Sequence, residues 1–176
     1  MAVFMLAYAT ADAPLPAGVE QRLTTILAAA GTPMTLRSAG LAVACVDLGL
    51  WPSSGVQSGS AGSACITAIA GDPVMCIDGA GIGRAASIKR LAAALLMQDL
   101  QLLPSCEGTY CALAADLSRG TAMVVVDKLA VRPVYVGTHQ GVVYVASALW
   151  MLERLADLPK QCDWRGITEV SAFGYA

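Results

Sequence analysis

Charged and aromatic side chains are scarce in this chain of 176 residues. Only 14% of the residues are Asp, Glu, Lys or Arg and 6% are aromatic, whereas 56% are hydrophobic and the mean hydropathy is +0.61. The 11 basic and 13 acidic residues nearly balance, and no basic cluster stands out, which argues against nucleic-acid binding. The hydrophobic excess predicts one large core in a single domain over 1–176, with an apolar face left for a partner domain or subunit.

Histidine, export signals and long uninterrupted apolar stretches are also missing. His139 is the sole histidine, so no zinc-type ligand set emerges with the 6 cysteines. The uncharged stretch between Asp47 and Asp72 is broken by Pro52 and by repeated Gly and Ser, which indicates loops rather than a membrane helix. The first cation is Arg22, so the opening residues lack a basic signal region. We expect no metal site, no membrane span, and a cytoplasmic protein whose cysteines are mostly small core residues.

Short apolar runs alternate with helical periodicities. Eight runs have strand composition: 1–8, 41–47, 64–71, 73–78, 109–116, 121–127, 133–137 and 142–147. Turn residues separate the last four runs, which predicts an antiparallel meander. Four segments are predicted to be helical: 19–30, 87–97, 148–156 and 164–173. The candidate N-terminal caps of the last three helices are Ser87, Ser147 and Asp163. This mixture predicts an α+β layered domain.

The segment DKLAVRPVY at 127–135 is similar to a motif of the asparagine synthetase family. In that family an Asp is followed by a Gly turn, Lys or Arg, Pro, Leu and Tyr, and here Asp127, Arg132, Pro133 and Tyr135 hold the matching positions. Further segments resemble family stretches in the same order: 106–116, 145–147, 158–159 and 173–175. The match covers about 105–176. It implies the family's N-terminal glutaminase-type domain, which is class II glutamine amidotransferase-like.

That resemblance implies a fold and a scaffold role for the motif. Family members have the αββα sandwich of the N-terminal-nucleophile hydrolases, in which two antiparallel sheets lie between helical layers. Each motif residue also has a simpler explanation, because Arg132 and Pro133 stand at a strand start and Asp127 could bond a turn backbone. The two interpretations are compatible. The match therefore predicts fold more directly than activity.

The residues that family glutaminases use for chemistry are replaced in this chain. The family's N-terminal cysteine corresponds to Ala2, which has no nucleophile. The Asn-Gly pair of the oxyanion hole corresponds best to Asp78 and Gly79, and an ionised carboxylate donates no proton to an oxyanion. The Asp that binds the glutamine ammonium falls in SIKR at 87–90, where Lys89 and Arg90 would repel that ammonium. We expect no glutaminase activity from this chain alone.

The resemblance implies a catalytically inactive domain that supports an ATP-dependent amide-forming synthetase. The family's pyrophosphatase loop, Ser-Gly-Gly-x-Asp-Ser, does not occur in the chain. ATP and Mg are therefore expected in a separate synthetase domain or subunit, and the chain would be a fragment or one half of a split enzyme. First domains without the cysteine occur in β-lactam-forming synthetases, carbapenam synthetases and lasso peptide macrolactam cyclases. The shortened glutamine-site segment is most similar to the lasso cyclases, which implies a peptide substrate.

Two other functions stay open at this point. The glycine-rich segment Gly79–Gly83 lies between a strand and a helix and could form a small-molecule or nucleotide-binding module. Its third glycine comes one residue early for a dinucleotide fingerprint, and no P-loop lysine follows. The chain could also be an N-terminal hydrolase with unrecognised processing, although cleavage before Thr10 would delete the first strand. A triad of Cys111, His139 and Asp127 has no motif uniting it.

Overall fold

Strand β1 (Ala2–Ala9) lies at the centre of one of two antiparallel sheets in the computed structural model, which describes residues 1–10, 14–58, 64–77 and 80–155. The strand order of this sheet is β2-β3-β1-β10-β9. The other strands are β2 (Met34–Arg37), β3 (Leu41–Asp47), β9 (Tyr135–His139) and β10 (Val142–Ala146). β1 pairs with β3 from Ala2 to Tyr8 and with β10 from Met5 to Ala9, so it joins early and late segments of the chain.

The second sheet is built around two long antiparallel strands, β5 and β7, which are paired along most of their length. Its order is β4-β5-β7-β8, with β6 paired to the end of β5. The strands are β4 (Val56–Ser58), β5 (Cys65–Ile77), β6 (Ala80–Gly81), β7 (Cys106–Asp116) and β8 (Thr121–Val126). β5 and β7 are in register from Cys65 opposite Asp116 to Met75 opposite Cys106.

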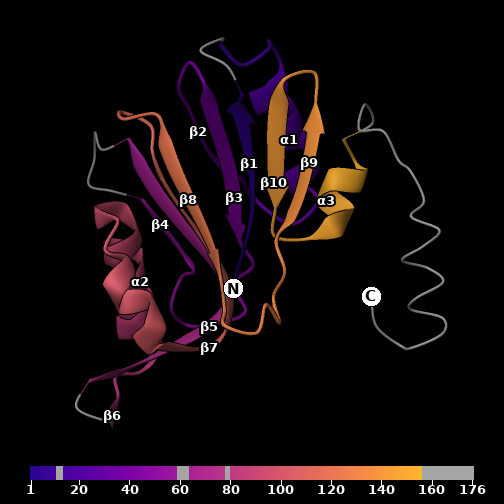
Figure 1. Ribbon diagram of the computed structural model, residues 1–176. Helices are drawn as coiled ribbons and strands as arrows, with labels where there is room; N and C mark the ends of the chain where they lie inside the picture. The colour runs from indigo at the N-terminus through magenta and orange to yellow at the C-terminus, as the bar shows by residue number, and fades with distance from the viewer. Residues whose placement is uncertain (11–13, 59–63, 78–79, 156–176) are drawn as a thin grey trace, which may run out of the picture.

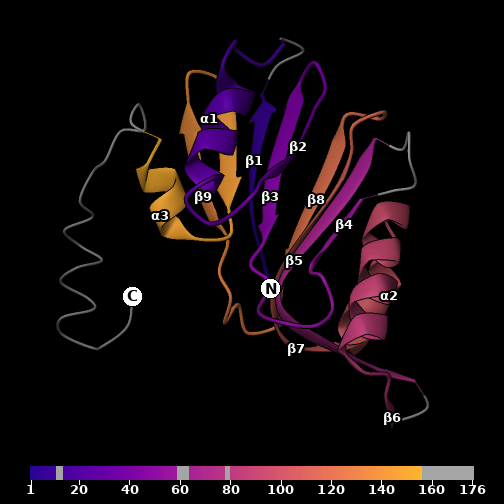
Figure 2. The same cartoon turned by 180° about the vertical axis from the view of Figure 1, so that it is seen from behind.

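The inner faces of the two sheets pack on each other, and helices cover both outer faces. In β1, Phe4 and Leu6 lie in the core between the sheets, whereas Met5 and Ala7 face the helices. Helices α1 (Val19–Leu27) and α3 (Leu149–Glu153) pack on the first sheet. Helix α2 (Arg84–Met97) and the 3-10 helix η1 (Leu100–Ser105) pack on the second (Figures 1 and 2). Strands buried on both faces need apolar residues at every position, which accounts for the low charge of the chain.

The α+β class and two antiparallel five-stranded sheets are confirmed. Most predicted elements are present with ends within three residues of the prediction, because their apolar periodicity matches the faces they bury. Strands β2 and β4 were not predicted, since their short sequences, MTLR and VQS, have no distinctive pattern. The segments at 158–159, 164–173 and 173–175, with the cap at Asp163, lie outside the described residues.

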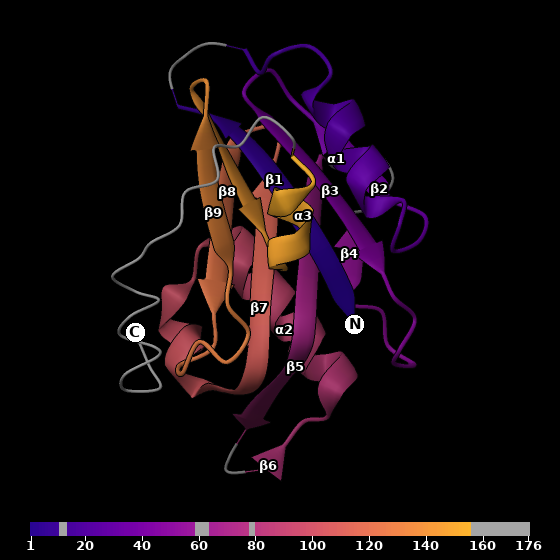
Figure 3. The ribbon, with the colours of Figure 1, turned by 90° about the vertical axis from the view of Figure 1, so that its right-hand side faces the viewer.

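The predicted four-strand meander is wrong. β7 and β8 form a hairpin in the second sheet, whereas β9 and β10 form a hairpin in the first. The chain crosses between the sheets over residues 127–134, next to the N-terminus (Figure 1). In Figure 3 the first sheet and α3 lie in front and the second sheet lies behind. A period of two indicates strands but carries no information on which sheet they join, so the local pattern could not reveal the crossing.

The separate strands predicted at 64–71 and 73–78 are one strand, β5. Gly71 and Pro73 indicated a break, yet the pairing with β7 continues through both residues. Gly71 has φ +106, and a Cβ there would lie 2.2 Å from the carbonyl oxygen of Thr109. Opposite Pro73 stands Gly108, with φ +88. The glycines let the two backbones stay close where a proline interrupts the regular ladder.

The predicted serine caps are also wrong. Helix α2 begins at Arg84, so Ser87 lies in its first turn. Its hydroxyl accepts from the backbone N–H of Met75 at 3.0 Å and donates to the Gly83 carbonyl at 2.8 Å, which ties the helix to β5. At α3 the cap position belongs to Ala148. The Ser147 hydroxyl accepts from the backbone N–H of Phe4 at 2.9 Å and so joins the helix start to β1.

Candidate functional site

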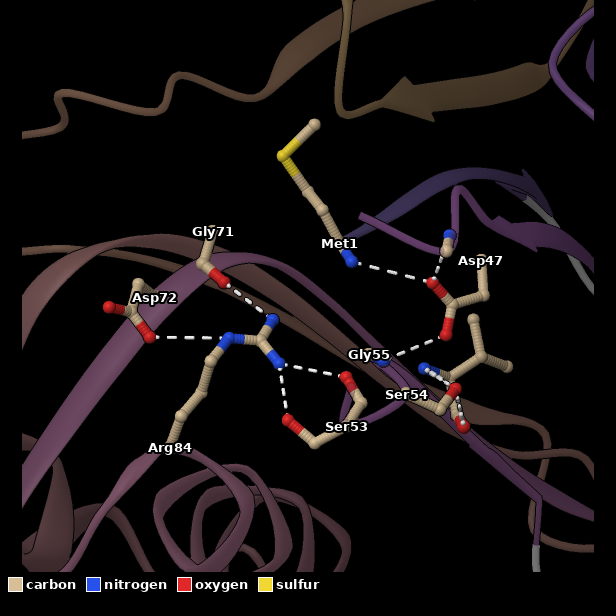
Figure 4. Close-up of polar contacts among 10 residues, drawn as sticks. Met1, Asp47, Ser53, Ser54, Gly55, Gly71, Asp72 and Arg84 are labelled. Atoms are coloured by element: carbon tan, nitrogen blue, oxygen red, sulfur yellow. Dashed lines mark hydrogen bonds and ion pairs between the residues drawn. The ribbon is translucent and has the colours of Figure 1, made fainter. Parts of the chain in front are cut away.

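The N-terminal end of β1 is where the family resemblance would place a nucleophile. The ammonium of Met1 lies 3.4 Å from Oδ1 of Asp47, the last residue of β3 (Figure 4). The Asp47 carboxylate also accepts from the backbone N–H of Gly49 at 3.0 Å and of Gly55 at 3.1 Å. Burial alone would raise the pKa of Asp47, but hydrogen bonds from Ser54 and Gly49 and the nearby ammonium lower it overall. A charged carboxylate therefore anchors the chain start and the loop after β3.

Ala2 is enclosed by this loop. Its exposed fraction is 0%, and its methyl group belongs to the core between the sheets. A Cβ on Gly55 would lie 2.5 Å from the carbonyl oxygen of Ile69 and 3.0 Å from the backbone nitrogen of Ala2. Only glycine permits such close backbone packing. The position thus holds an inert side chain, and glycine brings the loop directly against it.

Arg84 fastens the same loop to the second sheet. Its guanidinium donates to the Ser53 carbonyl at 2.8 Å, to the Ser53 hydroxyl at 2.7 Å and to the Gly71 carbonyl at 3.1 Å (Figure 4). Nε lies 3.2 Å from Oδ1 of Asp72, and the guanidinium carbon lies 5.1 Å from the centre of the Trp51 ring. The Arg84 side chain is only 13% exposed. One cation at the start of α2 therefore holds the loop, β5 and an aromatic ring together.

The predicted oxyanion residues, Asp78 and Gly79, lie outside the described residues. Their neighbours Ile77 and Ala80 are exposed, and β6 projects away from the two sheets (Figure 1). Lys89 and Arg90, which were predicted to repel a substrate ammonium, are exposed on α2. The structure therefore does not place these two cations in the core between the sheets, where Ala2 lies.

The glycine-rich segment is described only from residue 80 onward. Gly81 pairs with Cys76 through β6, and a Cβ on Gly81 would meet no atom within 4 Å. Gly83 occupies the cap position of α2 with φ +78, and its carbonyl accepts from Ser87. Chain conformation at the helix start thus accounts for Gly83.

Asp127 organises the crossing between the sheets. Its carboxylate accepts four backbone N–H groups, from Tyr110 at 3.2 Å, Leu129 at 3.0 Å, Val131 at 3.1 Å and Arg132 at 3.1 Å. The residue is only 4% exposed. Burial would raise the pKa of Asp127, but these four hydrogen bonds lower it overall. Asp127 therefore stabilises the turn that redirects the chain, as its simpler interpretation predicted.

The other motif residues lie just beyond this turn. Arg132 packs its side chain against Gly71, where an added Cβ would lie 2.8 Å from both Cδ and Nε of Arg132. Pro133 precedes β9, and Tyr135 opens β9 opposite Ala146. Arg132, Pro133 and Tyr135 all line one pocket beside the start of α3. The structure thus brings together the residues that the motif singled out.

The triad of Cys111, His139 and Asp127 is not assembled. Burial raises the pKa of the Cys111 thiol to about 11, and the neighbouring Arg132 only partly opposes this shift. Cys111 lines the same pocket as Tyr135, whereas His139 stands at the other end of β9, about 13 Å along the strand from Tyr135. The Asp127 carboxylate accepts hydrogen bonds from backbone N–H groups and not from His139. Cys111 is a buried neutral thiol, as the core interpretation predicted.

Sequence reasoning missed Asp47, Gly55 and Arg84. Asp47 was visible as a charged residue at the end of an apolar strand, and Arg84 as the first cation after a glycine-rich turn. Asp47 bonds the nearby Gly49, but its contacts with Gly55 and Met1 span 8 and 46 residues, and the contact of Arg84 with Ser53 spans 31. No local pattern encodes contacts of that range.

Within residues 1–10, 14–58, 64–77 and 80–155, no group of three His, Cys, Asp or Glu side chains is placed to hold a metal ion. No helix in that part of the chain is long and apolar enough to cross a membrane. Comparisons of the sequence with models of protein families and with curated proteins give no match.

Proposed function

We propose that this chain is a glutaminase-type domain with the αββα sandwich of the N-terminal-nucleophile hydrolases, without the nucleophile. In this proposal it is the non-catalytic half of an ATP-dependent amide-forming synthetase of the asparagine synthetase kind, as in lasso peptide cyclases. The observation that carries it is Ala2, which is fully buried at the N-terminal end of the central strand, with Gly55 packed against it. A methyl group offers no lone pair to attack an amide, so no covalent intermediate forms.

The arrangement of layers supports the fold part of this proposal. Two antiparallel sheets pack face to face with helices outside, and the central strand of the first sheet begins at Ala2, which lies in the core between the sheets. Cleavage before Thr10, which an N-terminal hydrolase of this sequence would require, would remove all of β1. That strand supplies the pairing partners of both β3 and β10. Loss of the central strand would leave one edge of β3 and one edge of β10 unpaired and would divide the first sheet in two, so processing at this site would disrupt the fold.

Exposed apolar side chains support a partner domain or subunit. Four of them lie on the crossing between the sheets or on the elements next to it: Leu129 at 84%, Val131 at 56%, Val136 at 64% and Leu149 at 49% exposed. Exposed apolar side chains near one another in the fold are often covered in an assembly. In the proposal the partner carries the pyrophosphatase loop and binds ATP and Mg, and the assembled enzyme takes a peptide substrate.

Ammonia release from glutamine tests the loss of chemistry. The purified chain is incubated with glutamine, and ammonia is measured by coupling to glutamate dehydrogenase. We expect no release above that of a heat-denatured sample. Intact mass should show an N-terminus at Met1 or Ala2. Turnover of glutamine, or a mature end at Thr10, would contradict the proposal in favour of a processed hydrolase.

Two further measurements address the partner. The coding sequence beyond Ala176, or an adjacent gene, should contain Ser-Gly-Gly-x-Asp-Ser. Co-expression of that synthetase with the chain should give a stable complex, and ATP–pyrophosphate exchange should depend on both parts. Titration of the isolated chain with ATP should show no micromolar binding, because binding by the chain alone would favour a nucleotide module at Gly79–Gly83.

A further inference from the structure

A second feature of the molecule is the pocket that lies between the crossing segment, β7, β9 and the start of α3. Its volume is about 330 Å³, within the lower range of small-molecule sites. Four side chains with polar nitrogen or oxygen atoms line it: Thr109, Arg132, Tyr135 and Ser147. Apolar walls come from residues such as Ala70, Pro133 and Leu149. The pocket thus combines one cation, three hydroxyl groups and a hydrophobic surface.

Three of these polar groups have no hydrogen-bond partner among the described residues, whereas the Ser147 hydroxyl is bonded to the backbone of Phe4. No described residue hydrogen-bonds or ion-pairs with the guanidinium of Arg132, and the same holds for the hydroxyls of Thr109 and Tyr135. Arg84 shows the contrast, because its guanidinium has hydrogen bonds to Ser53 and Gly71. A half-buried arginine whose guanidinium has no acceptor among the described residues is suited to binding an anion.

Asp127 does not accept hydrogen bonds from the Arg132 guanidinium. It is the nearest carboxylate in sequence to Arg132, but its two oxygens already accept four backbone N–H groups. It bonds the backbone N–H of Arg132 and makes no ion pair with its guanidinium within 4.0 Å. The side chain of Arg132 is instead laid against Gly71, which has no Cβ to displace it. Arg132 therefore lines the pocket in a position that requires glycine at residue 71.

We propose that this pocket binds the carboxylate of a small organic acid, with Arg132 as the anion-binding residue and Thr109 and Tyr135 as additional hydrogen-bond donors. The planar guanidinium matches the two oxygens of a carboxylate, and the apolar walls accommodate a hydrocarbon body. The thiol of Cys111 lines the pocket in its neutral form, so the ligand is held without covalent reaction. This site does not depend on the proposed synthetase role and does not involve Ala2.

Benzoate is a suitable probe because it carries a carboxylate on an apolar ring. Its binding to the purified full chain is measured by isothermal titration and by NMR shifts, alongside benzamide, its neutral analogue, and inorganic phosphate. We expect saturable benzoate binding, at least about tenfold weaker binding of benzamide, and weaker binding of phosphate. Equal affinity for benzamide, tighter binding of phosphate, or no saturable benzoate binding would overturn the proposal.

Variants locate the site. Arg132→Gln should weaken benzoate binding at least about tenfold, and Thr109→Val, which keeps the side-chain shape, about three- to fivefold. Arg119→Gln is the matched control, because Arg119 is exposed at the turn after β7 and should leave the affinity unchanged. Thermal unfolding confirms that each variant is folded, and Thr109→Val decides alone if Arg132→Gln is not. Unchanged benzoate affinity in the folded pocket variants would refute the assignment.

Discussion

Replacement of Asp127 tests the account of the crossing between the sheets. The carboxylate accepts four buried or half-buried backbone N–H groups, and a net contribution of about 1 kcal/mol for each gives about 4 kcal/mol of unfolding free energy lost in Asp127→Ala. Asp127→Asn keeps one acceptor oxygen and should lose about 2 kcal/mol. Asp99→Asn is the matched control, since Asp99 accepts one exposed N–H, from Gln101, and should lose less than about 1 kcal/mol.

Urea unfolding followed by circular dichroism measures these losses, and its pH dependence gives a second reading. The folded-state pKa of Asp127 is lowered, so its contribution is complete above the unfolded pKa of about 3.9 and is lost as the pH falls through the folded value. The gap between the wild type and Asp127→Asn should therefore be constant near neutral pH and shrink below about pH 4. A loss no larger than that of the Asp99 control, or a gap that does not shrink in acid, would refute the reasoning.

Two further substitutions and one labelling experiment test contacts and burial in other parts of the molecule. Gly108→Ala should lower the unfolding free energy by about 2 to 4 kcal/mol, because the new Cβ would lie 2.2 Å from a carbonyl oxygen of β5 at φ +88; an unchanged urea midpoint would contradict this. Arg84→Gln should increase protease cleavage within residues 48–55, whereas the exposed control Arg90→Gln should not. Iodoacetamide at pH 8 should modify exposed Cys76 and spare Cys45, because burial raises the pKa of the Cys45 thiol to about 12. Peptide mass spectrometry measures the labelling, and faster modification of Cys45 than of Cys76 would contradict this prediction.

Elements with a strong local pattern could be predicted from the sequence. β1 and β3 are apolar at nearly every position because both of their faces are buried, and α1 repeats apolar residues on one side because only that side meets a sheet. The turn at Asp127 was also visible, since all but one of its N–H donors lie within five residues of it. These features are decided by neighbours in the sequence.

The arrangement of those elements could not be predicted from local patterns. Whether β9 continues the second sheet or joins the first depends on the pairing of β10 with β1, which lies at the other end of the described chain. Gly71 and Pro73 indicate a break between two strands in the sequence. Only the pairing with β7, some forty residues later, keeps β5 one continuous strand. At the candidate site, Ala2 was identified from its position, whereas the contacts that enclose it join residues 8 or more positions apart, from Asp47 with Gly55 to Arg84 with Ser53.

The pairing of β1 with β10 has a consequence for synthesis of the protein in the cell. Met5 is translated early, whereas its partner Ala146 is added 141 residues later, which takes roughly 7 to 30 seconds at ordinary elongation rates. Until then one edge of a hydrophobic strand emerges from the ribosome without its neighbour. We expect the nascent chain to be a chaperone client over that interval, and ribosome-bound chains stalled before residue 142 to aggregate on release while those stalled well beyond residue 155 remain dispersed.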